Sequence, residues 1–485
     1  MTSDIRKPPA AYTSERIRAV SDLPGPKGIP ILGNAWQIDP SKARRQFEQW
    51  GAQHGTPFRL KLGPKQVVVW DSHHVAQQLM RDRPERFRRG GRISEVLDQM
   101  RIGGLFAAEG AAWLPQRRMV MQALNGTHFP AFFPVMRTIA LRLHRRLARL
   151  SDEDQVVDLL EELTGFTVDT VCALAFGSDP DTMEQGPDRI QQHLKKIFPM
   201  FMKRLLAPLP YWNWFKLPQD RALDAALDEV HGFVRGLIDH ARQEILANPA
   251  HPATNLLQSM LMAQSHASAE GGDARSLSDD AIAANVLTLL LAGEDTTAHS
   301  LAWSIPRLCA DTALQEELAV QASTLMGQDV VCADYGLLKH FDLFEAVVTE
   351  SQRLQPVVGM LSFTPTSTTV LDGVELTPDC IAYFITGPAM VDASNFHDPL
   401  RFDPRRWLER REGIAHEPRA FVQFGAGPRV CPGRHLASVQ MRLVLTTLLR
   451  NFRIELACAP DAIEEINAFT VMPVSYTHLT LPTKA

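Results

Sequence analysis

Hydrophobic residues recur every three to four positions over most of the chain between residues 113 and 354. This spacing places apolar side chains on one helical face and polar ones on the other, most clearly over residues 131–150 and 220–247. Ser278 is followed by two aspartates, which is typical of a helix N-terminus, because a serine hydroxyl caps the first backbone N–H groups and acids are favourable beside them. The pattern predicts a largely helical core with a long helix starting near residue 278.

A second pattern, alternation of apolar and polar residues, marks short strands at both ends of this helical region. Phe58, Leu60 and Leu62 alternate with basic residues before Gly63-Pro64, which is a turn sequence, so residues 57–72 predict a β-hairpin. Further short strand signals occur over residues 358–387. The segment 263–273 is rich in Ser, Ala, Gly and His and is expected to be an exposed connection. Because no internal repeat and no linker separates two cores, we expect one mainly α domain with a small β-rich lobe.

The composition is that of an ordinary globular protein, with 45% hydrophobic and 22% charged residues. A net charge of −5 gives no reason to expect nucleic acid or an anionic membrane as a partner. The six cysteines lack CxxC spacing, so a disulfide framework is not expected and a reducing compartment is. The first 50 residues contain no apolar run that would anchor the chain in a membrane, and acidic residues among them disfavour a transit peptide. We therefore expect a soluble, cytoplasmic protein.

One cysteine near the C-terminus has surroundings that suit a metal-bound thiolate. Cys431 lies between Gly427 and Gly433, and glycines let the backbone turn tightly and approach a flat partner. The amphipathic helix that follows would direct its free N–H groups at the sulfur, which favours the anion. Arg429 can meet an acidic group on the partner. With Phe424 these residues form FxxGxRxCxG, which resembles the haem-binding loop of the cytochrome P450 family.

The long helix predicted from residue 278 carries a second motif, Ala292-Gly293-Glu294-Asp295-Thr296-Thr297. It resembles the oxygen-activation motif of the same family, (A/G)Gx(D/E)T(T/S). A glycine inside a helix costs about 1 kcal/mol relative to alanine, so we expect Gly293 to leave room for a cofactor face or for O2. The Thr296 hydroxyl can bond back to the Ala292 carbonyl, and Asp295 can relay protons. Taken alone, the motif fits ordinary helix residues with a surface charge at Asp295 equally well, and Cys431 downstream favours the functional interpretation.

Two further motifs match the family in order along the chain. Glu350 and Arg353 form an ExxR pair, for which the resemblance implies a buried triad with Arg406 that braces the cysteine loop. Trp113 and Arg117 form WxxxR, whose members contact a haem propionate in the family. Residues 361–366 lack the arginine that many relatives place there for the second propionate, so that partner is left open.

The resemblance implies haem b (iron protoporphyrin IX) as cofactor, with Cys431 as the axial ligand of the iron. It also implies a soluble, bacterial-type monooxygenase that inserts one atom of O2 into a lipophilic small molecule. Too few residues follow Cys431 for a reductase module, so electrons would come from a ferredoxin- or flavodoxin-type protein with its NAD(P)H-dependent reductase. Arg118, Arg434 and Arg442 are candidates for its docking surface. No transmembrane anchor is expected.

Three alternatives remain open from the residues. A peroxygenase or isomerase could use the same haem, but such relatives usually lack the acid–alcohol pair. A non-catalytic haem-binding sensor would not consume reductant. A zinc site at Cys431 and His435 would offer only two of the four ligands that a structural zinc needs. His299 has no visible second ligand and is interpreted as an ordinary helix residue.

The sequence is least informative in one apolar segment and at its two ends. Residues 197–215 are apolar and punctuated by prolines, and they predict either a packed connection between helices or, by the resemblance, the wall of an entry channel or a membrane contact. We assign residues 1–22 to an N-terminal extension and 23–473 to the haem domain. Residues 474–485 do not resemble the family's usual ending, so we interpret them as a non-native tail and exclude them from the fold prediction.

Overall fold

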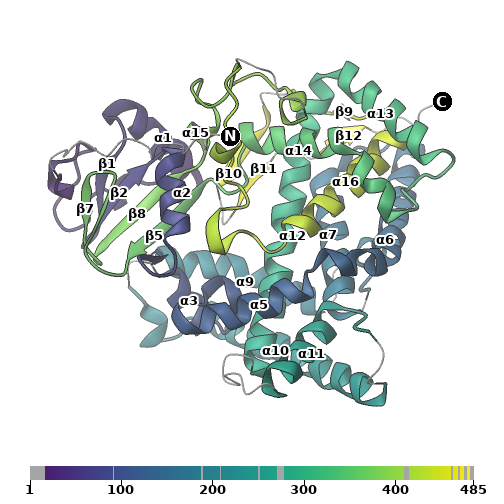
Figure 1. The fold of residues 1–485 in the computed structure, drawn as a ribbon, viewed down its shortest axis with the longest axis horizontal. Coiled ribbons are helices and arrows are strands. Elements are labelled where there is room, and N and C mark those ends of the chain that lie inside the picture. The colour runs from purple at the N-terminus through teal and green to yellow at the C-terminus, as the bar shows by residue number, and fades with distance from the viewer. Residues whose placement is uncertain are drawn as a thin grey trace, which may run out of the picture.

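Helices fill most of the chain, as the spacing of apolar residues predicts (Figure 1). The computed structural model describes residues 17–90, 92–177, 179–186, 189–207, 209–248, 252–269, 278–408, 414–459, 462–467, 470–474 and 478–480. The α-helices are α1 (Ala43–His54), α2 (His73–Arg81), α3 (Ile93–Gln99), α4 (Gly104–Ala107), α5 (Trp113–Ala123), α6 (Phe129–Asp152), α7 (Leu159–Phe176), α8 (Thr182–Gln185), α9 (Arg189–Leu206), α10 (Pro218–Ala247), α11 (Leu256–Ala269), α12 (Asp279–Ala310), α13 (Thr312–Met326), α14 (Asp342–Leu354), α15 (Gly387–Met390) and α16 (Arg434–Asn451).

The strands are short and fall where the alternation predicts them, with others near the C-terminus. They are β1 (Phe58–Leu62), β2 (Lys65–Trp70), β3 (Phe87–Arg89), β4 (Val157–Asp158), β5 (Met360–Pro365), β6 (Thr369–Leu371), β7 (Val374–Leu376), β8 (Cys380–Ile385), β9 (Glu455–Leu456), β10 (Glu464–Asn467), β11 (Val471–Val474) and β12 (His478–Thr480). The predicted hairpin over residues 57–72 is confirmed as β1 and β2. The mainly α fold with a small β lobe is confirmed as well.

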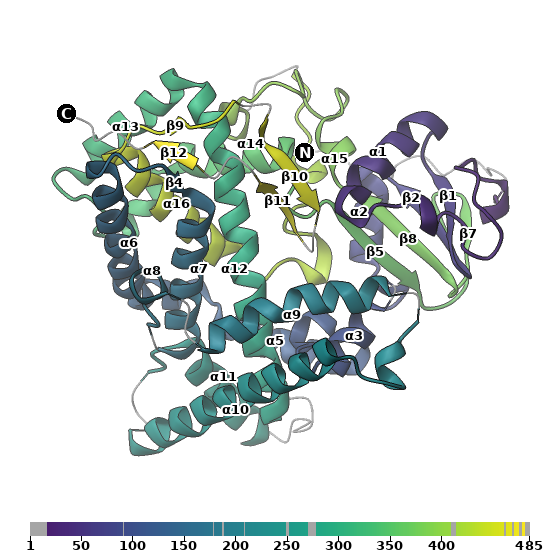
Figure 2. The same ribbon diagram turned by 180° about the vertical axis from the view of Figure 1, so that it is seen from behind.

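The β lobe is a five-stranded sheet in the order β1-β2-β8-β5-β3 (Figure 2). Strand β2 pairs with β8 in parallel, and the remaining neighbours in this sheet are antiparallel. The side chains of Val67 and Val69 pack in one apolar cluster, whereas Val68 and Trp70 pack in another on the opposite face. Because both faces of β2 are buried, its sequence is a continuous apolar run rather than an alternation.

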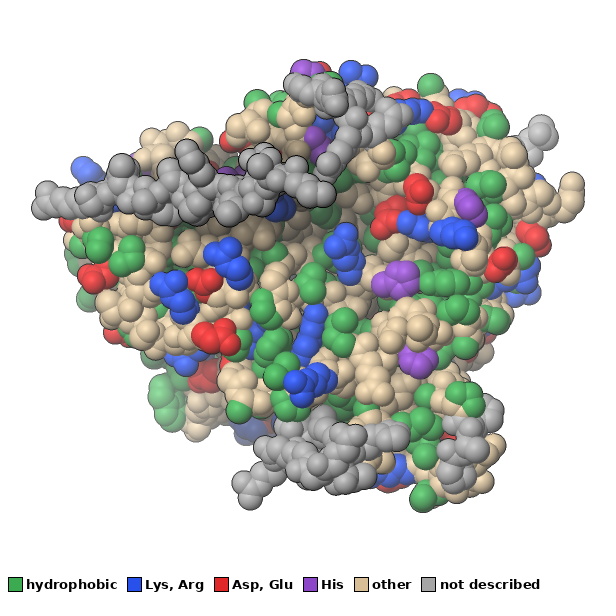
Figure 3. Space-filling view, in the orientation of Figure 1, with side chains coloured by type: hydrophobic (Ala, Val, Ile, Leu, Met, Phe, Trp, Pro, Cys, Tyr) green, Lys and Arg blue, Asp and Glu red, His purple; other side chains and the backbone are tan. Residues whose placement is uncertain are grey.

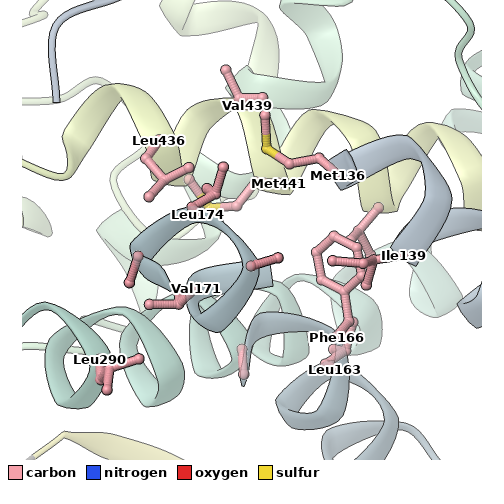
Figure 4. Close-up of a cluster of buried hydrophobic side chains, with 14 of the residues drawn as sticks. Met136, Ile139, Leu163, Phe166, Val171, Leu174, Leu290, Leu436, Val439 and Met441 are labelled. Atoms are coloured by element: carbon pink, nitrogen blue, oxygen red, sulfur yellow. The ribbon is translucent and has the colours of Figure 1, made fainter. Parts of the chain in front are cut away.

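The helical core is built around α12, which is buried on nearly all sides. Its predicted N-cap is confirmed, because the Ser278 hydroxyl accepts a hydrogen bond from the Ala281 N–H at 3.2 Å. Figure 4 shows α7 between its neighbours, with Val171 towards the helix that carries Leu290 and Leu174 towards Leu436 of α16. The packing of α7, α12 and α16 fixes the beginning of α16, where the cysteine loop ends.

Parts of the two ends have a place in the fold. Residues 17–22 of the predicted N-terminal extension are described, and Arg18 forms a β-bridge to Val374 of β7, whereas residues 1–16 lie outside the described residues. Of the suspected non-native tail, residues 475–477 and 481–485 lie outside the described residues, but β12 pairs with β4 and β9.

The predicted exposed connection over residues 263–273 is helical in its first part, because residues 263–269 continue α11. Residues 270–273 lie outside the described residues. Along the described residues no helix is long and apolar enough to cross a membrane.

Candidate active site

The cysteine loop places the sulfur of Cys431 at the start of α16. Its backbone N–H donates to the Phe424 carbonyl at 2.8 Å, which closes the loop. Burial raises the pKa of the Cys431 thiol, while hydrogen bonds from the N–H groups of Gly433 and Arg434 and the charge of Arg117 act in the opposite direction. Cys431 is exposed, and a sulfur with hydrogen-bond donors on one side is stabilised as a thiolate when a metal cation binds it from the open side. The geometry therefore suits an iron or another thiophilic metal.

Of the two glycines in the FxxGxRxCxG motif, Gly427 is required by the packing of the loop. It adopts a φ of 66°, and a Cβ there would lie 2.9 Å from the carbonyl oxygen of Met80 in α2. Any other residue would force the loop away from α2. At Gly433 a Cβ would lie 3.9 Å from the Cys431 sulfur, which is an ordinary contact distance. A glycine is therefore required at position 433 only if a bound group occupies that space.

Arg429 lies against the predicted Trp113–Arg117 element. Its guanidinium carbon is 4.7 Å from the centroid of the Trp113 ring. It already has an acidic partner in the chain, because it donates to Glu109 at 2.6 Å. Arg117 is buried, and burial lowers its pKa while the nearby Cys431 thiol opposes that shift. Trp113, Arg117, Arg429 and Cys431 are thus brought together, as the motifs predict.

The sequence reasoning missed three residues around Arg429. The other oxygen of Glu109 accepts hydrogen bonds from the guanidinium of Arg83 at 2.8 Å and from the backbone N–H of Arg89 at 2.9 Å. The Arg89 guanidinium lies over the ring of Phe106, 3.6 Å from its centroid. No motif marks these residues, and the Glu109–Arg429 pair joins positions 320 residues apart. A clustering of arginines in residues 83–89 was the one available signal.

The middle of α12 has the predicted local geometry. The Thr296 hydroxyl donates to the Ala292 carbonyl at 2.7 Å. Ala292 is exposed and residues 293–296 are half-buried, whereas most of α12 is buried, so this part of α12 faces open space inside the fold. Burial raises the pKa of the Asp295 carboxyl, which favours its protonated form. A carboxylic acid beside a hydroxyl is a chemically competent proton relay.

The predicted reason for Gly293 is wrong. A Cβ at this position would lie 2.9 Å from a methyl group of Val171 in α7. The missing side chain therefore lets α7 and α12 approach closely, and the space is filled by Val171 instead of a cofactor face. The stiffness of a β-branched neighbour makes this contact hard to relieve.

The arginine brace forms as the motif predicts, and it contains one more member. The fully buried Glu350 carboxylate accepts two hydrogen bonds from Arg353 at 2.8 Å and one from Arg406 at 2.9 Å. The Trp407 indole, on a residue that departs from the family pattern, also donates to it at 3.0 Å. The triad thus holds the segment 397–407 on α14. Its link to the cysteine loop is indirect, through the contact of Trp407 with Phe421.

His299 has a more specific setting than the sequence indicates. It is buried on α12, one turn after Thr296, and its Nδ1 lies 2.9 Å from the hydroxyl of Thr470, just before β11. Burial lowers its pKa to about 4, so the ring is neutral near pH 7. His435 hydrogen-bonds with Tyr335 at 2.9 Å. Among the described residues no group of three or more His, Cys, Asp or Glu is placed to hold a metal ion, so the structural zinc alternative has no support.

The apolar segment 197–215 divides into a packed part and an exposed part. Ile197 and Trp212 are buried, and the Trp212 indole donates to Gln99 of α3 at 2.8 Å. Trp214 and Phe215 are exposed. The packed-connection interpretation therefore holds for Ile197 and Trp212, whereas the entry-channel or membrane interpretation stays a prediction for the exposed end of the segment.

Comparison with known proteins agrees with this arrangement. The model of the family described as Cytochrome P450 matches residues 23–479. Among similar proteins, cytochrome P450 94A1 of Vicia sativa is 25% identical over 88% of this chain and 84% of its own length. Cytochrome P450 3A5 of Homo sapiens is 23% identical over 89% and 85%. Sterol 26-hydroxylase, mitochondrial, of Oryctolagus cuniculus is 26% identical over 87% and 80%.

Proposed function

Because this chain belongs to the cytochrome P450 family, and is therefore a haem-thiolate monooxygenase that binds haem b, we propose that the sulfur of Cys431 would bind the iron. The observation that carries this proposal is the position of its sulfur, beside the N–H groups that open α16 and near Arg117. We propose further that Asp295 and Thr296 deliver protons, and that Trp113, Arg117 and Arg429 hold the porphyrin carboxylates.

The residues around Cys431 fit this cofactor chemically. The sulfur is a ligand for iron, and the guanidinium groups are partners for carboxylates. Arg429 supports the fit most directly, because its Nε atom is buried and has no hydrogen-bond partner among the described residues. A buried donor without a partner costs about 1–3 kcal/mol, and an added carboxylate would remove that cost.

When bound, haem supplies the iron that activates O2, so that one oxygen atom enters the substrate and the other leaves as water. The chain's own residues then control protons and space. The half-buried Asp295 carboxyl keeps its proton to a higher pH than an exposed acid does, since burial raises its pKa. Thr296 keeps its hydroxyl fixed on the Ala292 carbonyl, where the oxygen can pass a proton on. Exposure of Ala292 leaves that face of α12 accessible to a small molecule.

We propose a lipophilic substrate and a separate electron donor of the ferredoxin or flavodoxin type. The exposed Trp214 and Phe215 of the α9–α10 connection support the first point. The candidate surface for the second is a hollow of about 640 Å³ that adjoins the cysteine loop; Arg419 and Arg434 line it together with the acidic Asp342 and Glu345. Basic side chains also run down the middle of the face drawn in Figure 3.

The basic candidates predicted for donor docking differ in how available they are. Arg118 and Arg434 are exposed. Arg442 forms ion pairs with Glu345 and Asp342, so a charge on a donor would have to compete with both carboxylates.

Membership of a soluble, bacterial-type, cytoplasmic subgroup stays a prediction. The relatives compared above come from a plant and from animals, and sterol 26-hydroxylase is named as mitochondrial, so they support the family and not this subgroup. Fractionation of the source cells into cytosol, membranes and organelles tests the prediction, and recovery with a membrane or organelle fraction would contradict it.

The decisive test of the proposed function is the absorption spectrum of the reduced, CO-bound protein. Thiolate ligation by Cys431 gives the red-shifted Soret band typical of this family, whereas Cys431→His gives an unshifted band. A wild-type protein without the shifted band would overturn the assignment of Cys431. Consumption of reductant and O2 with a lipophilic ligand, measured next to activity with peroxide alone, separates a monooxygenase from a peroxygenase and from a sensor.

A further inference from the structure

The guanidinium group of Arg83 lies beside strand β5, which contains no arginine. In β5 the buried Phe363 pairs with Arg89 of β3 on one side and with Ala382 of β8 on the other. The guanidinium carbon of Arg83, from the segment before β3, is 5.6 Å from the centroid of the Phe363 ring. Arg83 therefore packs against β5 although it comes from a different segment of the chain.

The carboxylate of Glu109 is the centre of this group, which we call the Glu109 cluster and which comprises Arg83, Arg89, Glu109 and Arg429. One oxygen of Glu109 binds Arg83 at 2.8 Å, and the other binds Arg429 at 2.6 Å. Only 6% of Arg83 is exposed, and only 7% of the Arg429 side chain. Two guanidinium groups and the backbone N–H of Arg89 therefore share one carboxylate in a largely buried position, while the Arg89 guanidinium donates to the Phe106 carbonyl at 3.0 Å.

The Glu109 cluster is short of negative charge. Burial and the neighbouring Arg83 lower the pKa of Arg429 to about 10, and they lower that of Arg89 to about 9. The Nε atoms of Arg83 and Arg429 are buried and find no hydrogen-bond acceptor in the described part of the chain. Buried cations without enough counter-charge are costly, so a second anion beside these arginines would be stabilising. A planar carboxylate matches the fork of a guanidinium best.

We propose that Arg83 and Arg89 supply the carboxylate-binding position that β5 lacks, and that they hold the second propionate of the haem. This inference rests on the proposed function, since it takes Cys431 and Arg117 as the other haem contacts. Glu109 then has a positioning role, because it holds Arg83 and Arg429 together from two distant parts of the chain. The alternative is that the Glu109 cluster only joins the β lobe to the helices and takes no part in binding the cofactor.

The test compares haem with haem dimethyl ester, in which both propionates are neutral. Wild type, Arg83→Met and Arg89→Met are loaded with each porphyrin, and the rate of porphyrin transfer to excess apomyoglobin is measured. Arg86→Met and Arg88→Met are the matched controls, because both arginines are exposed on the same segment. Each charge-assisted hydrogen bond lost should speed the release of haem by about ten- to a hundredfold.

The expected pattern is specific to the carboxylates. Arg83→Met and Arg89→Met speed the release of haem but change the release of the dimethyl ester by less than about twofold, and the two controls change neither. Equal acceleration for both porphyrins, or none for haem, would overturn the inference, because a merely structural role cannot distinguish them.

Two further measurements keep the result unambiguous. If Arg83→Met does not fold, Arg83→Lys is used instead, because it keeps the charge but loses the planar fork of the guanidinium. Arg83→Lys should release haem faster than wild type does, and it should release the dimethyl ester at the wild-type rate. Release of both porphyrins at wild-type rates by Arg83→Lys would then count against the inference. The reduced, CO-bound spectrum is recorded for each variant. A shifted band with no discrimination between the porphyrins refutes only the role of Arg83 and Arg89, whereas an unshifted band in wild type refutes the assignment of Cys431.

Discussion

Replacement of Glu350 by glutamine should destabilise the protein severely although the side chain keeps its shape. The carboxylate accepts five hydrogen bonds, from Arg353 twice, from Arg406, from the Asp403 N–H and from the Trp407 indole, all between 2.8 and 3.0 Å. A carboxylate only accepts hydrogen bonds, whereas one end of an amide only donates them. In Glu350→Gln the amide nitrogen must therefore face buried donors.

The magnitude follows from those contacts. An amide nitrogen in place of Oε2 loses the hydrogen bond from Arg353, about 1.5–3 kcal/mol, and the one from Trp407, about 1 kcal/mol. In addition, Arg353 is fully buried and loses its counter-charge, and breaking such buried pairs costs about 3–5 kcal/mol. Because these terms overlap, we expect a loss of about 4–6 kcal/mol, which is a large part of a typical stability of about 5–15 kcal/mol.

The assay is urea unfolding followed by far-UV circular dichroism, with the haem content of the purified protein as a second readout. Trp407→Phe removes one neutral donor and should cost about 1 kcal/mol. Arg405→Met removes an exposed ion pair with Glu317 next to the brace and should change the free energy of unfolding by less than about 1 kcal/mol. A free energy for Glu350→Gln within about 1 kcal/mol of wild type would show that the negative charge is not what holds this segment.

Four further predictions concern the site itself. Cys431→Ala should abolish monooxygenase activity, measured as product formed with a lipophilic substrate; retained activity would exclude its sulfur as the ligand. Thr296→Ala should keep its haem but divert reductant to hydrogen peroxide, and product formation still coupled to reductant use at the wild-type level would contradict the proton relay. Between pH 6.5 and about pH 4 the unfolded chain binds a proton at His299 that the folded chain does not, so stability falls as the pH is lowered through this window, by about 3 kcal/mol for this group. The urea midpoints of wild type and His299→Gln should lie closer together at about pH 5 than at about pH 7.5. The same difference between the two midpoints at both pH values would contradict this role of His299. Gly293→Ala should lose about 1–2 kcal/mol in urea unfolding through the clash with Val171, and the same change in a Val171→Ala background should cost nothing; equal costs in both backgrounds would exclude the clash.

The sequence predicts best where a motif is local. The Thr296 hydroxyl bonds four residues back, and the Ser278 cap bonds three residues ahead, so helix geometry alone places both. Glu350 and Arg353 are three residues apart on one helix for the same reason. The resemblance adds Arg406, because the family pattern supplies a contact that spacing cannot.

The remaining features depend on which elements pack together. Gly293 was expected to face a cofactor, since the sequence does not show that Val171 of α7 fills that side. The Glu109 cluster joins residues from three separate segments, and the pairing of β3 with β5 that brings Arg89 beside Phe363 spans most of the chain. Such contacts follow from tertiary packing, which a single sequence does not specify.

The parallel pairing of β2 with β8 has a consequence for biosynthesis. When β1 and β2 leave the ribosome, the apolar run of β2 has one edge without a partner, because β8 is translated about 300 residues later. At about 5–20 residues per second this interval lasts from roughly 15 seconds to a minute. During it, an exposed apolar edge can pair with other nascent chains. Slower initiation, lower temperature or added chaperones should therefore raise the yield of soluble protein more than changes around Cys431 would.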